Sequence, residues 1–458
     1  MQLPIELLRS LEGVKGFDEG AFINVHDSGK QVTSIRVNPY KPSVVSRESS
    51  AVNMSYDSRL TIHEKIPWTD YGYYLSSRPS FTFDPLFHAG CYYVQEASSM
   101  FLEQALKQTV ALSQPLKVLD LCAAPGGKST HLLSLISKES LLVSNEVIRS
   151  RANILNDNIS KWGCSNVIVT NNDPRDFQRL QNYFDVIVVD APCSGSGLFR
   201  RDAEAIEEWS EQNVVLCSQR QQRILADVLP ALKNGGVLIY STCSYSKQED
   251  EEICEWLVKE FKIENLKLKI EYEWGISETD NGYRFWPDKV RGEGFFIACF
   301  KKSNSDDEEK YLPRVKPEKF SSREMEILNK HLNTYGLSFL KHGEIIYAVP
   351  EKLLADINFL SLKLRLVNCG TKVGEIIRDK LIPDHALALS NIISDKIQKE
   401  ELDIEQAIQY LKKKELNLQT DKKGWSVVTF QGHLLGWVNI LSNRINNYYP
   451  KELRILKD

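Results

Sequence analysis

The stretch that decides the fold is Leu116-Lys117-Val118-Leu119-Asp120-Leu121, followed directly by Cys122-Ala123-Ala124-Pro125-Gly126-Gly127-Lys128-Ser129. The first six residues form a short apolar run of the kind found in buried strands. The small residues after it allow a tight turn in which the backbone comes close to a ligand, and a helix start favours polar or anionic groups. The sequence therefore predicts a strand, a ligand-binding turn and a helix at 116–129.

Apolar runs alternate with helix-length segments on the C-terminal side of this turn. The runs lie at 141–144, 167–170, 184–189 and 236–240, and the clearest helical segments are 149–162 and 214–232. Strands that alternate with helices predict an α/β fold with a doubly wound parallel sheet. A last apolar run at 295–300 predicts an added edge strand.

Polar residues follow five successive predicted strands. After the Cys122–Lys128 turn they are Glu146, Asp173, Asp190 with Cys193 close behind, and Cys243. All carboxyl ends of an open parallel sheet lie at one edge, where ligands bind. Each residue alone is explained as well by a helix cap or a core thiol. Their joint occurrence after five strands indicates a functional site.

The segment Gly127-Lys128-Ser129 also matches the end of a phosphate-binding loop. Asp190 would then imitate the magnesium-binding Asp of an NTPase. Cys122, however, stands where such a loop needs its first glycine, and the dinucleotide fingerprint Gly-x-Gly-x-x-Gly is absent. An NTPase remains an alternative at this point.

Composition narrows the function classes. The 458 residues suggest about three domains, and 57 Lys and Arg against 61 Asp and Glu give a net charge of −4. Contact with nucleic acid must therefore rest on local patches. With no apolar run of about 18 residues and no signal-peptide pattern, we expect a cytoplasmic protein without a membrane span. The nine cysteines include no Cys-x-x-Cys pair, so we expect reduced thiols and no metal site.

Four segments are expected along the chain. They are an N-terminal domain at 1–112, the α/β domain at 113–302, a polar linker at 303–313 and a C-terminal region at 314–458. The last contains predicted helices at 323–332 and 404–413 and a hairpin at 427–438. We expect the parallel sheet to close before the linker, so that a chain ending near Lys302 folds on its own.

Segments 119–129, 190–197 and 241–246 resemble the Nop2/Sun family of RNA cytosine-5 methyltransferases, which use S-adenosylmethionine. The resemblance extends over residues from about 35 to 300. Segments 381–389 and 436–454 resemble the C-terminal extension of RsmF-type (YebU-type) 16S ribosomal RNA methyltransferases. The resemblance implies a Rossmann-like S-adenosylmethionine-dependent methyltransferase sheet, a small N-terminal α+β RNA-binding domain and a C-terminal PUA-like RNA-binding region.

The resemblance also implies a role for each site residue. Cys243 is the nucleophile that adds to carbon 6 of cytosine, Asp190 binds the base's polar edge, and Cys193 promotes release of the adduct. Glu146 binds the cofactor's ribose and Asp173 its adenine. The residues expected to hold the cofactor's methionine end are Cys122, Ala123, Ala124, Pro125, Gly126, Gly127 and Lys128, with Asp190 beside them. No metal is required.

The implied partner is RNA, most simply 16S ribosomal RNA or the 30S subunit, with the target cytidine single-stranded or flipped out. Candidate phosphate contacts are Arg36, Arg200 and Arg201. In the C-terminal region, the residues that suit a PUA-like RNA-binding appendage are Lys412–Lys414, Lys422, Lys423 and Trp425.

Three further alternatives remain open. One is a transfer RNA cytosine-5 methyltransferase. Another is a DNA cytosine methyltransferase, which would use Cys193 as its nucleophile. The third is a catalytically silent RNA-binding or ribosome-assembly factor.

Overall fold

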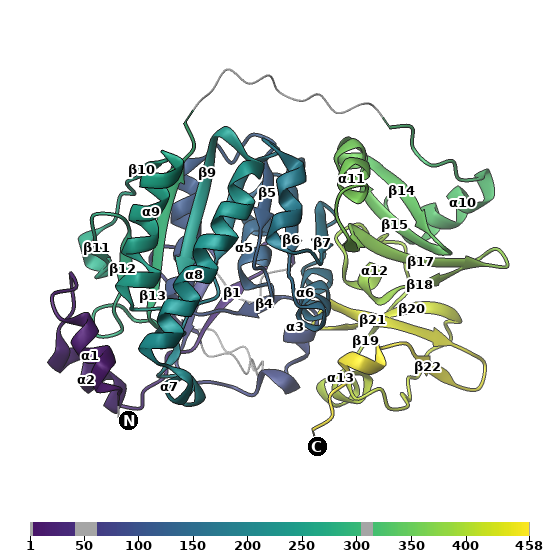
Figure 1. Ribbon diagram of the computed structural model, residues 1–458. Coiled ribbons are helices and arrows are strands. Elements are labelled where there is room, and N and C mark those ends of the chain that lie inside the picture. Colours follow the sequence, from purple (N-terminus) through teal and green to yellow (C-terminus); the bar gives the residue numbers. More distant parts are fainter. Residues whose placement is uncertain (1–2, 42–61, 304–314, 458) are drawn as a thin grey trace.

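The computed structural model describes residues 3–41, 62–303 and 315–457. At its centre, five neighbouring strands run parallel in the order β9-β8-β5-β6-β7 (Figure 1). They are β5 (Lys117–Asp120), β6 (Leu141–Asn145), β7 (Val167–Thr170), β8 (Phe184–Asp190) and β9 (Leu232–Thr242). Chain order reverses on either side of β5, so the predicted doubly wound sheet is confirmed and the ligand edge lies above β5 and β8.

The 295–300 run is β13 (Phe295–Lys301). The prediction that this strand lies at the edge of the sheet is wrong. It pairs antiparallel with β9 on one side, and on the other with β12 (Tyr283–Phe285) and β10 (Glu264–Leu266). The short β11 (Ser277–Glu278) extends the sheet beyond β12. Six of the seven β13 residues are buried, because the strand is covered on both faces as well as on both sides.

Helices cover both faces of this sheet, and alternate strand residues face opposite cores. Val118 packs on the side of α4 (Leu102–Thr109), α5 (Gly127–Leu135) and α6 (Arg149–Trp162). Leu119 packs on the side of α8 (Glu211–Val228), α9 (Glu251–Phe261) and α11 (Leu354–Ser361). The short α7 (Glu204–Glu208) precedes α8. In the described part of the chain, no helix is long and apolar enough to cross a bilayer.

The N-terminal residues form two helices and a separate sheet. The helices α1 (Ile5–Leu11) and α2 (Glu19–Asp27) lie at the far left of the molecule (Figure 1). The sheet has the order β2-β3-β1-β4, and α3 (Pro85–His88) precedes β4. Its strands are β1 (Ser34–Val37), β2 (Ile62–Lys65), β3 (Gly72–Leu75) and β4 (Tyr92–Val94).

The C-terminal region contains two further sheets. The first comprises β14 (Leu337–His342), β15 (Ile345–Pro350), β17 (Thr371–Ile377) and β18 (Lys380–Pro383). The second comprises β19 (Lys399–Glu401), β20 (Gly424–Phe430), β21 (His433–Ile440) and β22 (Ile445–Asn447), and β20–β21 is the predicted hairpin. Three helices accompany them, α10 (Ser322–His331), α12 (His385–Leu389) and α13 (Ile404–Leu411).

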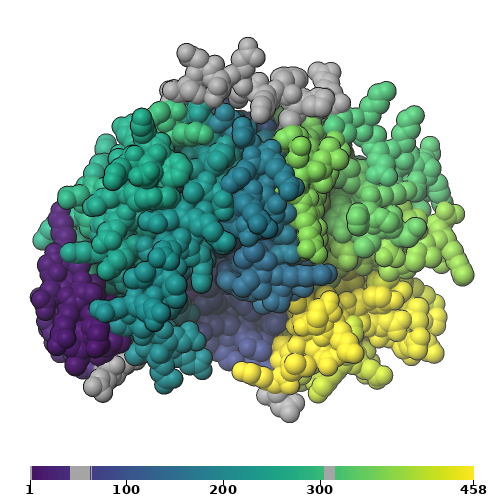
Figure 2. Space-filling view, viewed as in Figure 1, coloured from purple at the N-terminus to yellow at the C-terminus, as the bar shows by residue number. Residues whose placement is uncertain are grey.

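The C-terminal region is interwoven with the rest of the chain. Its strand β16 (Leu366–Cys369) pairs antiparallel with β7 and completes the central sheet, so the expectation that the sheet closes before the linker is wrong. At the other end, the Cys91 thiol lies 3.0 Å from His433 Nδ1 within a core shared by the N-terminal sheet and the β20–β21 hairpin. Figure 2 shows the C-terminal residues, in yellow, packed against the blue segments. Residues 304–313 of the predicted linker lie outside the described residues.

Candidate active site

The turn between β5 and α5 is built for close approach of a ligand. Gly126 caps α5 with φ +115°, a conformation that glycine favours, and a Cβ there would lie 3.2 Å from Leu155 Cδ1. Backbone hydrogen bonds fix the turn to both neighbouring strands, since Ala123 N donates to Asn145 O (2.8 Å) and Leu121 N to Val188 O (3.0 Å). The predicted turn is therefore present at the ligand edge.

The polar side chains of this turn face inward. Lys128 Nζ lies 2.7 Å from Asp190 Oδ2, and Ser129 Oγ donates to Asp120 Oδ2 at 2.6 Å. Burial raises the pKa of Asp120 to about 7, against the opposing effects of Ser129 and Lys128. Because Ser129 is buried and Lys128 is paired with an acid, this turn does not present the side chains that an NTPase uses on phosphate and magnesium.

Glu146 and Asp173 occupy different environments. Glu146 directly follows β6 and is buried; its Oε1 accepts a hydrogen bond from Ile148 N at 2.9 Å, and Arg151 Nη1 lies 3.7 Å from its Oε2. Oε2 thus keeps lone pairs for a hydroxyl donor, which fits a ribose. Asp173 caps a 3₁₀ turn by accepting from Arg175 N at 3.2 Å.

Asn145 is a site residue that sequence reasoning missed. Its Nδ2 donates to Leu121 O (3.1 Å) and Asn172 O (3.0 Å), while its Oδ1 accepts from Thr170 Oγ1 (2.8 Å). One amide therefore ties the ends of β5, β6 and β7 together. Its position at the end of an apolar run, directly before Glu146, is the signal that could have indicated it.

The two predicted cysteines meet at the same edge. Cys193 follows β8, Cys243 follows β9, and their Sγ atoms are 3.1 Å apart. A hydrogen bond with Cys243 and burial raise the pKa of the Cys193 thiol well above its usual range. A backbone hydrogen bond also joins the loops that follow β8 and β9, since Gly197 N donates to Cys243 O at 2.8 Å.

Asp190 lies between the turn and the thiols. It is the last residue of β8, and its Oδ1 accepts from Ser241 Oγ at 2.7 Å while Oδ2 pairs with Lys128. Burial alone would lower the pKa of Lys128, but Asp190 outweighs it and the pKa is raised; a Cys243 thiolate acts in the same direction. Lys128 therefore interacts electrostatically with both Asp190 and Cys243.

Two of the three arginines predicted to contact phosphate are buried. Arg36 donates to Gln95 Oε1 (2.8 Å) and Thr130 Oγ1 (2.6 Å) and lies over the Trp162 ring. Arg200 donates to Gly292 O (3.1 Å) and to Lys30 O. Those two predictions are wrong, because both guanidinium groups join segments inside the protein. Arg201 is exposed, as a phosphate contact requires.

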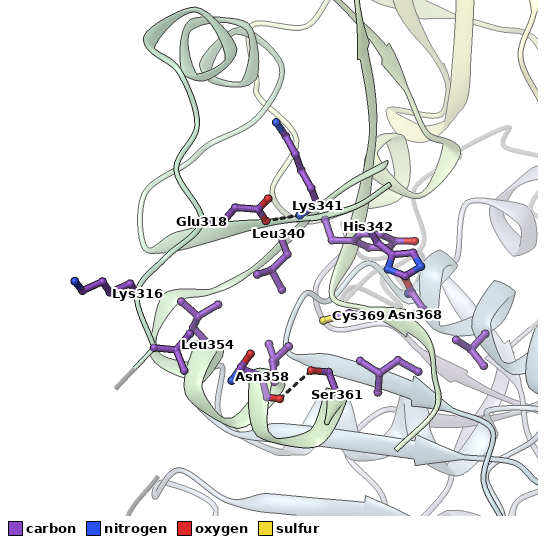
Figure 3. Close-up of a pocket in the computed structure, with 15 residues that line it drawn as sticks. Lys316, Glu318, Leu340, Lys341, His342, Leu354, Asn358, Ser361, Asn368 and Cys369 are labelled. Carbon is purple, nitrogen blue, oxygen red and sulfur yellow. Dashed lines mark hydrogen bonds between the residues drawn. The ribbon is translucent and has the colours of Figure 1, made fainter. Parts of the chain in front are cut away.

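A separate cavity of about 550 Å³ lies between α11 and the β14–β15 hairpin (Figure 3). Its inner wall carries Leu340, Leu354 and Ile357, and its lining includes none of the predicted site residues. Glu318 in its wall already accepts a hydrogen bond from Lys341 N (2.7 Å). The chemistry-bearing residues thus gather at the sheet edge rather than in this hollow. Within the described residues, no group of three or more His, Cys, Asp or Glu could hold a metal ion.

A parallel sheet of this order, with a glycine turn after β5 and an acid after β6, forms a cofactor-binding edge of the Rossmann type. The fold is that of the S-adenosylmethionine-dependent methyltransferases, as the similar proteins show. Residues 107–301 match the family 16S rRNA methyltransferase RsmB/F, residues 3–97 the N-terminal domain of 16S rRNA methyltransferase RsmF, and residues 398–455 the methyltransferase RsmF PUA domain. The chain belongs to the RsmF family of ribosomal RNA small subunit methyltransferases.

Relatives named ribosomal RNA small subunit methyltransferase F match along almost the whole chain. The protein from Vibrio vulnificus is 30% identical, covering 92% of this chain and 90% of its own length. The protein from Shewanella woodyi is 31% identical, with 91% of each chain covered.

Solved structures show the same fold over two thirds of the chain. A methyltransferase homologue from Pyrococcus horikoshii is 28% identical with a TM-score of 0.52, covering 66% of this chain and all of its own. NSun6 from Pyrococcus horikoshii, determined with SFG, is 18% identical with a TM-score of 0.53, covering 66% of this chain and 99% of its own.

Proposed function

We propose that this protein methylates carbon 5 of cytidine in 16S ribosomal RNA through a covalent bond between Cys243 and the base. The observation that carries the proposal is the pair of thiols 3.1 Å apart, beside the Lys128–Asp190 pair at the ligand edge. Membership of the RsmF family and the names of the relatives support ribosomal RNA as the substrate.

The chemistry explains why this edge needs a nucleophile. Carbon 5 of cytosine is too weak a nucleophile to accept a methyl group unaided. When the Cys243 thiolate bonds to carbon 6, the electron pair of the 5,6 double bond moves into the ring and makes carbon 5 nucleophilic. S-adenosylmethionine supplies the methyl group. Transfer of the carbon 5 proton to a base then restores the double bond and expels Cys243 as a thiolate; Cys193 is assigned to this release step.

The residues around the thiols suit these steps. Lys128 stabilises the Cys243 thiolate, and Asp190 offers carboxylate oxygens to the polar edge of the base. Cys193, whose Sγ lies 3.1 Å from that of Cys243, acts in release of the adduct. Glu146 and the Cys122–Lys128 turn hold the cofactor, and Asp173 is assigned to its adenine.

Recognition of folded RNA is assigned to parts outside the central sheet. The RsmF PUA domain and the N-terminal domain flank the sheet and share one core. The cytidine must be unstacked to reach the thiols, so a single-stranded or flipped-out base is the substrate.

The test is methyl transfer from isotope-labelled S-adenosylmethionine to naked 16S ribosomal RNA, assembled 30S subunits, transfer RNA and DNA, followed by nucleoside mass spectrometry. The expected product is 5-methylcytidine in ribosomal RNA. Label only in transfer RNA or DNA, or at another atom of the nucleoside, would overturn the assignment.

A further inference from the structure

Glu249 lies directly beneath both cysteine loops. It ends a short 3₁₀ turn (Lys247–Glu249) before α9, and its side chain is fully buried. Its Oε2 accepts hydrogen bonds from Ser194 Oγ and Ser244 Oγ, both at 2.6 Å, and its Oε1 accepts from Ser194 N at 2.7 Å. A single carboxylate therefore holds a residue from each loop.

The two serines occupy equivalent places. Ser194 directly follows Cys193, and Ser244 directly follows Cys243. Glu249 reaches the residue next to each thiol, and its side chain accepts hydrogen bonds from the two serines and from Gln221. Glu249 thus positions the thiols through the backbone of the two loops, while its charge also contributes to the raised pKa of Cys193.

Glu249 is itself held firmly from two other elements. Gln221 of α8 lies with Nε2 3.4 Å from Glu249 Oε1 and donates to Pro192 O at 3.1 Å. Tyr240 of β9 donates its hydroxyl to Glu249 O at 2.5 Å. The carboxylate is therefore fixed relative to the helix and the strand, and movement of either loop would break a charge-assisted hydrogen bond.

Such a buried acid is expensive to maintain. Burial raises the pKa of Glu249, while the serine and glutamine donors oppose the rise. A neutral, apolar group of similar size would avoid the desolvation cost. The gain from the carboxylate is geometric, because it joins two loops that are fifty residues apart in sequence.

We propose that Glu249 is a positioning residue that sets the separation of the Cys193 and Cys243 thiols. Its consequence for turnover rests on the proposed function, in which the two thiols act on adjacent atoms of one ring. Displacement of either loop then impairs both attack and release, without changing how the cofactor or RNA binds.

The primary test measures the thiol separation without substrate. The full-length protein is treated with diamide, which takes up two hydrogens and two electrons as the Cys193–Cys243 disulfide forms, and the linked peptides are followed by mass spectrometry. Glu249→Gln is expected to slow this reaction at least about tenfold, because an amide cannot accept all the donors that the carboxylate accepts.

The matched control is Glu103→Gln. Glu103 is another fully buried carboxylate with several donors, among them Thr69 Oγ1 at 2.7 Å, but it lies outside the two loops. It should lower thermal stability while leaving the rate of the Cys193–Cys243 reaction at the wild-type value. Equal slowing in both variants would reduce Glu249 to a general structural role and overturn the proposal.

Serine variants keep the proposal testable if Glu249→Gln does not fold. Ser194→Ala and Ser244→Ala each remove one hydroxyl donor and should slow disulfide formation, whereas Ser361→Ala, at the exposed end of α11, should not. In turnover, Ser244→Ala should lower kcat with KM for both substrates unchanged. Wild-type disulfide rates in both loop variants would overturn the proposal, even if Cys243 were shown to be the nucleophile. Slowed disulfide formation together with full activity of Cys243→Ala would leave the positioning role standing and remove the proposed mechanism instead.

Discussion

The loops that follow β8 and β9 present one cysteine each, yet the charges around the two thiols differ. Cys193 lies near the Glu249 carboxylate, which adds to the hydrogen bond and the burial that raise the pKa of this thiol. Cys243 lies near the Lys128 ammonium group. The difference teaches that two thiols in contact can have neighbours of opposite charge, and the proposed mechanism assigns attack to Cys243 and release of the adduct to Cys193.

The largest effect is expected for Cys243→Ala. Without the nucleophile, methyl transfer should fall at least about 10³-fold, equivalent to ~4 kcal/mol of barrier. No protein–RNA species should survive denaturing electrophoresis. If Cys243→Ala retained turnover, Cys243 would not be the nucleophile. If Cys243→Ala itself formed the covalent protein–RNA species, the roles of Cys193 and Cys243 would be exchanged.

Cys193→Ala should fail at a different stage. Attack and methylation by Cys243 can proceed, but release should stall, so multiple turnover falls by about 10²-fold or more while methylated RNA stays linked to the protein. Denaturing electrophoresis with labelled RNA measures the linked species. It should disappear in the Cys193→Ala/Cys243→Ala double variant.

Lys128→Met should weaken thiolate formation at Cys243 by removing the nearby cation. We expect a loss of roughly 10- to 100-fold in kcat, because attack on the base requires the thiolate. A suitable control is Lys233→Met, which breaks the Lys233–Asp185 pair (2.7 Å) at the opposite end of β8. A wild-type kcat in Lys128→Met would argue against the electrostatic difference between the loops.

The smallest effect on the reactivity of the two thiols is expected for substitutions of the residues assigned to the cofactor, Glu146 and Asp173. Glu146→Ala should weaken S-adenosylmethionine binding by roughly 2–3 kcal/mol, because the charge-assisted hydrogen bonds to ribose are lost. Asp173→Asn should cost less, since the Asp173 carboxylate already caps a turn. Calorimetry measures both, and diamide should still link Cys193 to Cys243 at the wild-type rate. Unchanged cofactor affinity in folded Glu146→Ala would remove Glu146 from the site.

The features that could be predicted from sequence are those encoded locally. Strands β5 to β8 and helix α6 follow from apolar runs and their spacing, and Glu146, Asp190, Cys193 and Cys243 follow because strand ends of a parallel sheet share one edge. Glu249 could not be predicted, because it stands in an acidic run with Asp250, Glu251 and Glu252, and only tertiary contacts distinguish it from the exposed Glu252. The prediction for Arg36 was wrong for the converse reason. Its charge suggested a surface position, but the guanidinium group is buried and donates its hydrogen bonds to acceptors inside the protein.

The pairing of β16 with β7 has a consequence for synthesis of the chain. The last strand of the α/β segment ends at Lys301 and β16 ends at Cys369, about 70 residues later. At ordinary translation speed, the edge of β7 therefore waits roughly another 3–14 s for its partner after the α/β segment is complete. An unpaired, apolar strand edge is a template for association with other chains. Each newly made copy thus passes through an interval in which the nascent central sheet is open to aggregation or to chaperone capture.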